Sequence, residues 1–213
     1  MFPPANDLIA LLGINLVLSA GCLRLLSWRR GVTPWGKWAS AAVFVLLWCP
    51  VGPASLPLVA YVRGISSDLS ISLVAIVCLG MYQRVSGIPL VGGRERTLVN
   101  VVFAVGALFL YPLALGWGDW DAYRLGWGSV GLWAVLLVLS LACWAKGFRL
   151  LPVLVALALL AWVAGAQEST NLWDYLIDPW LAVAAIFQCV RSAAGWGLAR
   201  LRGTPAGAIP SSS

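Results

Sequence analysis

Long apolar stretches alternate with short polar connections along the whole chain. Seven stretches can be marked, at residues about 8–26, 39–58, 68–83, 98–116, 129–145, 151–166 and 179–195. A helix needs about 17 to 25 apolar residues to cross the hydrocarbon core of a bilayer. The pattern therefore predicts an all-α integral membrane protein with a bundle of about seven transmembrane helices, six being the alternative count.

The charges of the connections alternate in sign along the chain. One set holds a single acid, Glu95, and twelve basic residues: Arg24, Arg29, Arg30, Lys37, Arg84, Arg94, Arg96, Lys146, Arg149, Arg191, Arg200 and Arg202. The other set holds Arg63 and Arg124 with seven acids: Asp7, Asp68, Asp119, Asp121, Glu168, Asp174 and Asp178. Basic residues are retained on the cytoplasmic side of membrane helices, so we expect the N-terminus outside and the C-terminus in the cytoplasm.

Composition supports this interpretation. Of the 213 residues, 61% are hydrophobic and 10% are charged, and the mean hydropathy is +0.90. A soluble domain of this size needs more polar surface. The net charge of +6 is explained by the cytoplasmic connections, and no basic run interleaves with aromatics, so nucleic acid is not an expected partner.

We expect one polytopic transmembrane domain over 1–195 and a basic cytoplasmic tail over 196–213, which ends in a flexible Gly/Pro/Ser segment. The second apolar stretch carries Pro50, Pro53 and Pro57, and proline interrupts a helix. Residues 50–65 are therefore expected either as a kinked helix end with an extracytoplasmic turn or as an elbow that dips back into the membrane.

The residue types that carry most cofactor chemistry are sparse. The sequence has no histidine, and its five cysteines (Cys22, Cys49, Cys78, Cys143 and Cys189) form no CxxC pair. Zinc sites and histidine-dependent triads are unsupported, and no nucleotide-binding or hydrolase motif occurs. We expect no cofactor and no metal, and the sequence favours a non-catalytic protein over an enzyme.

Three outer connections, 61–70, 116–128 and 167–180, would converge on one face of a bundle. They supply a candidate binding site of basic, acidic and aromatic residues: Arg63, Asp68, Trp120, Asp121, Arg124, Trp173, Asp174, Tyr175 and Asp178. The alternative needs no ligand, because tryptophan and tyrosine are enriched at both bilayer boundaries and acids cap helix starts.

Local patterns refine this site. Ser66 or Ser67 is expected to cap the third membrane helix, with Asp68 in its first turn, and Arg63 needs Asp68, another acid or a phosphate as its partner. Asp178 before Pro179 has the form of a helix start.

Residues 171–178 are expected as a short helical turn along the outer surface, capped by Asn171 three residues before Asp174. Trp173 and Trp180 are then expected at the lipid boundary. Neither caps nor an aromatic belt explains Asp174 together with Tyr175, so this pair is the first place to look for function.

The resulting hypothesis is a multi-pass bacterial inner-membrane protein, a non-catalytic subunit or accessory factor in the assembly or export of envelope lipid or glycan. Its partners would be the lipid bilayer, other membrane or periplasmic proteins and a lipid-linked or glycan ligand. The alternative is a small membrane transferase or transporter for a lipid-linked or amphipathic substrate at the outer leaflet.

Overall fold

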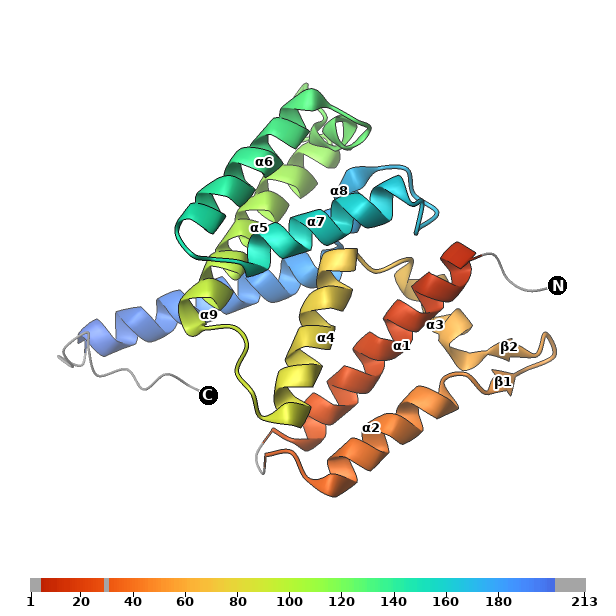
Figure 1. Ribbon diagram of the computed structural model, residues 1–213. Helices are drawn as coiled ribbons and strands as arrows, with labels where there is room; N and C mark the ends of the chain where they lie inside the picture. The colour runs from red at the N-terminus through yellow and green to blue at the C-terminus, as the bar shows by residue number, and fades with distance from the viewer. Residues whose placement is uncertain (1–4, 29–30, 202–213) are drawn as a thin grey trace.

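The computed structural model describes residues 5–28 and 31–201, and this part of the chain is all-helical apart from one short hairpin (Figure 1). The elements follow in the order α1 (Ala5–Leu26), α2 (Pro34–Leu46), β1 (Pro50–Val51), β2 (Leu56–Pro57), α3 (Leu58–Ser66), α4 (Ile71–Ser86), α5 (Gly93–Ala114), the 3-10 helix η1 (Ala122–Gly126), α6 (Val130–Ala145), α7 (Leu150–Val163), α8 (Leu172–Leu176) and α9 (Pro179–Leu201).

Two of the described helices, α1 and α5, are long and apolar enough to cross a membrane; each has 22 residues. The helices α4, α6 and α7 are apolar but shorter, at 16, 16 and 14 residues. The prediction of an all-α protein is confirmed. By length and composition only two helices qualify as membrane spans, and the count of about seven stays a prediction.

The helices form two groups that α4 and α7 join (Figure 1). In the first group α1 packs against α2 and α4, and in the second α5 packs against α9 while α6 packs against α7. The buried core includes Ile14 and Leu23 of α1 and Leu151 and Leu154 of α7.

Packing of α1 on α2 includes polar contacts. The buried Asn15 donates from Nδ2 to the carbonyl oxygen of Phe44 at 2.9 Å, and Ser40 donates to the carbonyl oxygen of Ser19 at 2.7 Å. Phe44 lies in the last turn of α2, where carbonyls lack partners within their own helix, so Asn15 satisfies a helix end from the neighbouring helix.

The second predicted stretch, 39–58, is not one helix. It is divided into α2, the hairpin of β1 and β2, and the start of α3. Gly52, with φ 71°, and Ser55, with φ 50°, turn the hairpin, and Tyr61 donates its hydroxyl to the carbonyl oxygen of Val51 at 3.0 Å. The prolines therefore mark a hairpin followed by a new helix, and the choice between an extracytoplasmic turn and an elbow that dips back into the membrane stays a prediction.

One helix start differs from its prediction. Ser70, not Ser66 or Ser67, caps α4 by accepting from the backbone N–H of Leu73 at 3.1 Å, so Asp68 precedes the helix. The last helix continues through Leu201, and the boundary between membrane domain and tail at residue 195 stays a prediction. The expected flexible segment lies outside the described residues.

Candidate functional site

The connections predicted to share one face do lie together. The buried Gln167, in the link from α7 to α8, donates from Nε2 to the carbonyl oxygen of Leu69 at 2.7 Å. Asn171 donates from Nδ2 to the carbonyl oxygen of Tyr123, in η1, at 2.9 Å. The three connections 61–70, 116–128 and 167–180 therefore form one hydrogen-bonded layer at this end of the bundle.

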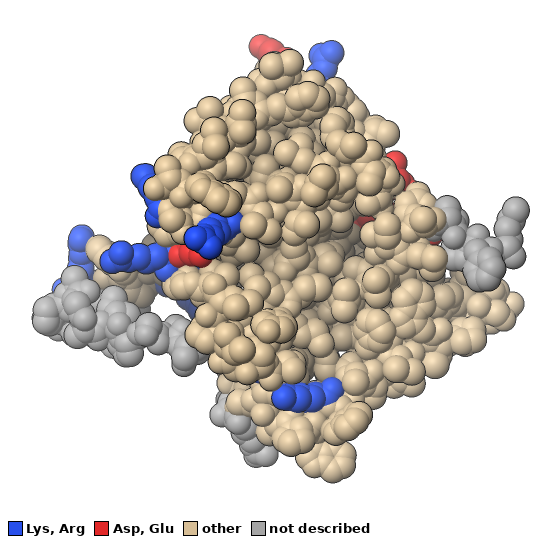
Figure 2. Space-filling model, viewed as in Figure 1, with Lys and Arg blue, Asp and Glu red and all other residues tan. Residues whose placement is uncertain are grey.

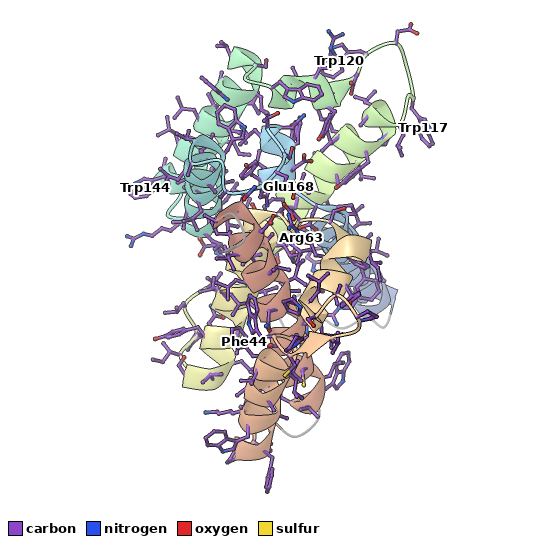
Figure 3. The ribbon with its side chains drawn as sticks, turned by 90° about the vertical axis from the view of Figure 1, so that its right-hand side faces the viewer. Phe44, Arg63, Trp117, Trp120, Trp144 and Glu168 are labelled. Atoms are coloured by element: carbon purple, nitrogen blue, oxygen red, sulfur yellow. The ribbon has the colours of Figure 1, made fainter. Side chains whose placement is uncertain are left out.

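Arg63, on α3, is the centre of this layer. Its Nε lies 2.7 Å from Asp68, its Nη1 2.8 Å from Asp7 of α1, and its Nη2 2.8 Å from Glu168. Figure 3 shows Arg63 and Glu168 side by side where these segments meet. The predicted Arg63–Asp68 pair is confirmed, and each guanidinium nitrogen is occupied by a carboxylate.

Electrostatics hold Arg63 in its charged form. The side chain is 18% exposed. Burial lowers the pKa of the Arg63 guanidinium, but hydrogen bonds to Asp68 and Asp7 and the charges of Asp68 and Glu168 outweigh it, so the pKa lies above its ordinary value. Arg63 joins three segments and has little capacity left for a phosphate ligand.

Asp178 ties two helix starts together. Its Oδ1 accepts from the backbone N–H of Leu181 in the first turn of α9 at 2.8 Å, and its Oδ2 accepts from the N–H of Ser70 at 2.7 Å. The side chain is buried. The expected start of α9 at Asp178–Pro179 is confirmed, and the contact with Ser70 adds a link between α9 and α4 that no local pattern predicts.

The helix α8 is short and buried. Asn171 caps it by accepting from the N–H of Trp173 at 2.9 Å, as expected, and Asp174 lies in its first turn. Trp173 is only 9% exposed, and its indole donates to the carbonyl oxygen of Ala122 at 3.1 Å. The positions expected for α8 along the outer surface and for Trp173 at the lipid boundary are therefore wrong, whereas Trp180 is exposed.

Asp174 and Tyr175 have separate partners. The Tyr123 hydroxyl donates to Asp174 at 2.7 Å, and the Ser169 hydroxyl also donates to this carboxylate. Tyr175 is fully buried and donates its hydroxyl to the carbonyl oxygen of Ser169 at 3.0 Å. Both residues hold the connection between α7 and α8 in place, which accounts for a pair that caps and belts left unexplained.

Asp174 also affects the pKa of the neighbouring Tyr123. Burial, followed by the hydrogen bond to Asp174 and the negative charge of Asp174, together raise the pKa of the Tyr123 hydroxyl to about 12. Tyr123 is therefore a hydrogen-bond donor at neutral pH and not a base.

A pocket of about 290 Å³ opens beside this contact. It is lined by Leu110, Tyr111, Ala114, Asp121, Tyr123, Asp174 and Ile177. Asp121 uses its Oδ1 to cap η1, accepting from the N–H of Tyr123 at 2.8 Å. The pocket has an apolar wall from α5 and two carboxylates opposite it, a lining that suits an amphipathic molecule with a hydroxyl or amine.

The remaining predicted site residues are not brought into one site. Trp120 is half-exposed and lies against Phe109, with ring centroids 5.9 Å apart. Figure 3 shows Trp117 and Trp120 at the upper edge of the bundle, far from Arg63. Arg124 is exposed. The candidates are therefore distributed over the Arg63 layer, the Asp178 and α8 contacts and the pocket, while Trp120 and Arg124 belong to none of these.

Several residues of this end are missing from the sequence-based candidates. Asp7 and Glu168 complete the Arg63 layer, and Tyr123 and Ser169 hold Asp174. The excess of acids over bases in the outer connections was the signal for Asp7 and Glu168, since a lone Arg63 needs several partners. Tyr123 and Ser169 are common loop residues with no such signal.

Among the described residues, no group of three or more His, Cys, Asp or Glu side chains is arranged to hold a metal ion. No protein-family model, no curated protein and no solved structure matches this chain. The class that fold and site define is therefore limited to an all-helical protein with two helices able to span a membrane and a tightly bonded polar layer at one end.

Proposed function

We propose that the chain is a multi-pass protein of a bacterial inner membrane that acts as a non-catalytic subunit or accessory factor in envelope lipid or glycan assembly or export. The seven spans would be α1, α2, α4, α5, α6, α7 and α9, which match the seven apolar stretches. Many large apolar side chains on these helices are exposed, for example Leu108 and Val138, as lipid-facing positions would be.

Contacts between helix ends favour this topology. Arg84, at the end of α4, donates to Ser27 after α1 at 3.1 Å, and Glu95, at the start of α5, accepts from the backbone N–H of Leu150 at the start of α7. These residues all belong to predicted cytoplasmic ends, just as Arg63 and its partners belong to predicted outer ends. Figure 2 shows blue side chains mainly at the left and lower rims and red ones mainly at the right and top, with a broad uncharged surface between.

One observation carries the non-catalytic assignment. The polar groups of the outer end that could do chemistry are engaged in joining segments: Arg63 contacts three carboxylates, and both oxygens of Asp178 accept backbone N–H groups. A general acid or base must be within reach of a substrate proton. Side chains that are occupied in this way stabilise the outer surface of the protein. A stable surface of this kind is suited to binding a partner protein.

Topology is tested by cysteine labelling in a variant without the five native cysteines. We expect Thr170→Cys, at the outer end, to react with a membrane-impermeant maleimide in intact cells. Ser86→Cys, at the inner end, should react only after permeabilisation. Labelling of both or neither variant in intact cells would contradict the seven-span arrangement.

The subunit role is tested by purification of the full chain in a mild detergent after chemical crosslinking in cells. We expect a membrane or periplasmic protein to co-purify with the wild type and crosslink through the outer end. Recovery of a lone monomer with no crosslinked partner would contradict the subunit role.

A second function, a small transferase or transporter for an amphipathic substrate at the outer leaflet, is favoured by the pocket of about 290 Å³ beside Asp121 and Asp174. Asp121→Asn keeps the oxygen that caps η1 but removes the charge. If the pocket handles a substrate, this variant fails to restore the envelope phenotype of a deletion strain while its abundance and unfolding temperature stay unchanged. Full restoration would remove this alternative.

A further inference from the structure

A groove of about 470 Å³ lies at the opposite end of α1 from the Arg63 layer. Its lining residues are Val32, Pro34, Lys37, Trp38 and Ala41, from the start of α2 and the residues before it. The start of α2, which supplies this lining, lies beside the ends of α1 and α4 at the bottom of Figure 1. In the proposed topology this end faces the cytoplasm.

Lys37 and Arg84 are two of the cations at this end, beside Arg24 in the last turn of α1, and among the described residues each of the two makes a single side-chain hydrogen bond. Lys37 donates from Nζ to the carbonyl oxygen of Val85 at 3.2 Å, and Arg84 donates from Nη1 to the Ser27 hydroxyl at 3.1 Å. In the described part of the chain, the ion pairs all involve Arg63, so neither cation has a carboxylate partner there. An ammonium has three donors and a guanidinium five, so several remain for an anion.

The two cations belong to one neighbourhood. The acceptor of Lys37 is the carbonyl of Val85, the residue next to Arg84, so α2 and the last turn of α4 are held together at the groove. Among the described residues, neither side chain has a carboxylate within ion-pair distance. This contrasts with Arg63, whose positive charge is surrounded by acids.

The rest of the groove is apolar and aromatic. Val32, Pro34 and Ala41 supply apolar lining, and Trp38 is 73% exposed at its edge. Tryptophan favours the boundary between headgroups and acyl chains. Cations beside an apolar groove at a membrane boundary match a molecule that carries a phosphate and hydrocarbon together, rather than free phosphate.

We infer that this groove binds the headgroup of an anionic phospholipid of the inner leaflet. Lys37 and Arg84 would donate to the phosphate, while Trp38 and the apolar lining contact the glycerol region and the upper acyl chains. Occupation would hold α1, α2 and α4 together at their cytoplasmic ends. This inference rests on the proposed membrane topology.

Native mass spectrometry of the full chain in a mild detergent tests the site. With added phosphatidylglycerol the wild type is expected to retain bound lipid, and with phosphatidylcholine of the same acyl chains to retain much less. The double variant Lys37→Gln, Arg84→Gln should bind phosphatidylglycerol at least about tenfold more weakly. Lys37→Arg, which keeps the charge, should retain binding.

Arg124→Gln is the matched control, because it removes an exposed cation from the other end of the bundle. It is expected to leave phosphatidylglycerol binding unchanged. The inference is overturned if the double variant and Arg124→Gln bind alike, if both lipids bind equally, or if inorganic phosphate displaces the lipid. Should the double variant unfold, Trp38→Ala must still weaken lipid binding for the inference to stand.

The outcomes separate this inference from the proposed function. If the protein labels with the expected topology but shows no preference for phosphatidylglycerol, only the inferred lipid site is contradicted. If the labelling does not follow the expected topology, the proposed function is contradicted, whichever lipid the protein binds.

Discussion

Arg63 lies between two helices and two connections, and its three carboxylate partners come from positions 7, 68 and 168. A charge at a membrane boundary is costly without partners, and here all three guanidinium nitrogens have one. Asp178 and Asn171 act in the same way, each satisfying a backbone group of a distant segment, and Tyr175 does so for Ser169, six residues earlier. At the residue scale, the polar side chains of this end of the protein are mainly structural.

Replacing Arg63 tests this conclusion. Arg63→Gln leaves three carboxylates together without their cation, and we expect it to lower the free energy of unfolding by about 2–4 kcal/mol, measured by thermal unfolding in detergent. Glu168→Gln should cost only about 0–1 kcal/mol, since the Glu168 side chain is 67% exposed.

Arg124→Gln is the control for Arg63, because Arg124 is exposed. It should change the free energy of unfolding by less than about 0.5 kcal/mol. Equal unfolding temperatures for Arg63→Gln and Arg124→Gln would show that the Arg63 layer does not stabilise the fold.

At the scale of elements, η1 and α8 form a unit that neither could form alone. Each has five residues, too few for a stable isolated helix. Asn171 and Trp173 of the α8 region donate to the carbonyl oxygens of Tyr123 and Ala122 in η1. The close approach of the two elements requires glycine at position 126.

Substitution of Gly126 should separate these elements. A Cβ at this position would lie 2.6 Å from Cγ of Asn171 and 2.8 Å from Cδ1 of Trp173. We expect Gly126→Ala to lower the free energy of unfolding by about 1–3 kcal/mol. It should also speed cleavage by protease in the connections 116–128 and 167–180.

Gly106→Ala provides the comparison, because a Cβ there meets nothing within 4 Å and alanine favours a helix. Its unfolding temperature should equal or exceed that of the wild type. A Gly126→Ala variant as stable and as protease-resistant as Gly106→Ala would contradict the tight docking of η1 on α8.

At the scale of the whole molecule, the short helices would set the thickness of membrane that the proposed bundle fits. With 14 residues α7 extends about 21 Å, and with 16 residues α4 and α6 each extend about 24 Å. A typical hydrocarbon core is about 30 Å thick, and mismatch costs free energy for each ångström. The proposed bundle therefore suits a thin or locally thinned bilayer.

Reconstitution in phosphatidylcholine bilayers of different acyl chain length tests this match. Because short helices leave polar ends in a thick core, we expect the unfolding temperature to be higher in bilayers of 14-carbon chains than in bilayers of 22-carbon chains. The headgroup stays constant, so charge does not contribute to the difference. A higher unfolding temperature in the thicker bilayer would contradict the spanning role of α4, α6 and α7.

Much of the fold and part of the site could be predicted from local pattern. The apolar stretches predicted helices near the observed positions, the Asp178–Pro179 pair predicted the start of α9, and Asn171 predicted the cap of α8. The Arg63–Asp68 pair was also predictable, because the two residues are five apart and of opposite charge. Each of these depends on neighbours within a few residues.

The predictions that the structure corrects were all based on local sequence. The caps at Ser66 or Ser67, the lipid-facing Trp173 and the unexplained Asp174 were each inferred from nearby sequence, whereas contacts with segments far along the chain involve Ser70, Trp173 and Asp174. Ser70 replaces the predicted cap and also donates its backbone N–H to Asp178, Trp173 donates to Ala122, and Asp174 accepts from Tyr123.

By itself, the sequence determined the helical class and the charge asymmetry of the connections, because these follow from local hydropathy and from the sign of nearby charges. Only the tertiary structure decided which polar groups meet at each end. It satisfied Arg63 with three acids and left Lys37 and Arg84 without carboxylate partners among the described residues. The reason is that such contacts join residues separated by up to about a hundred positions, and only packing of the helices brings them together.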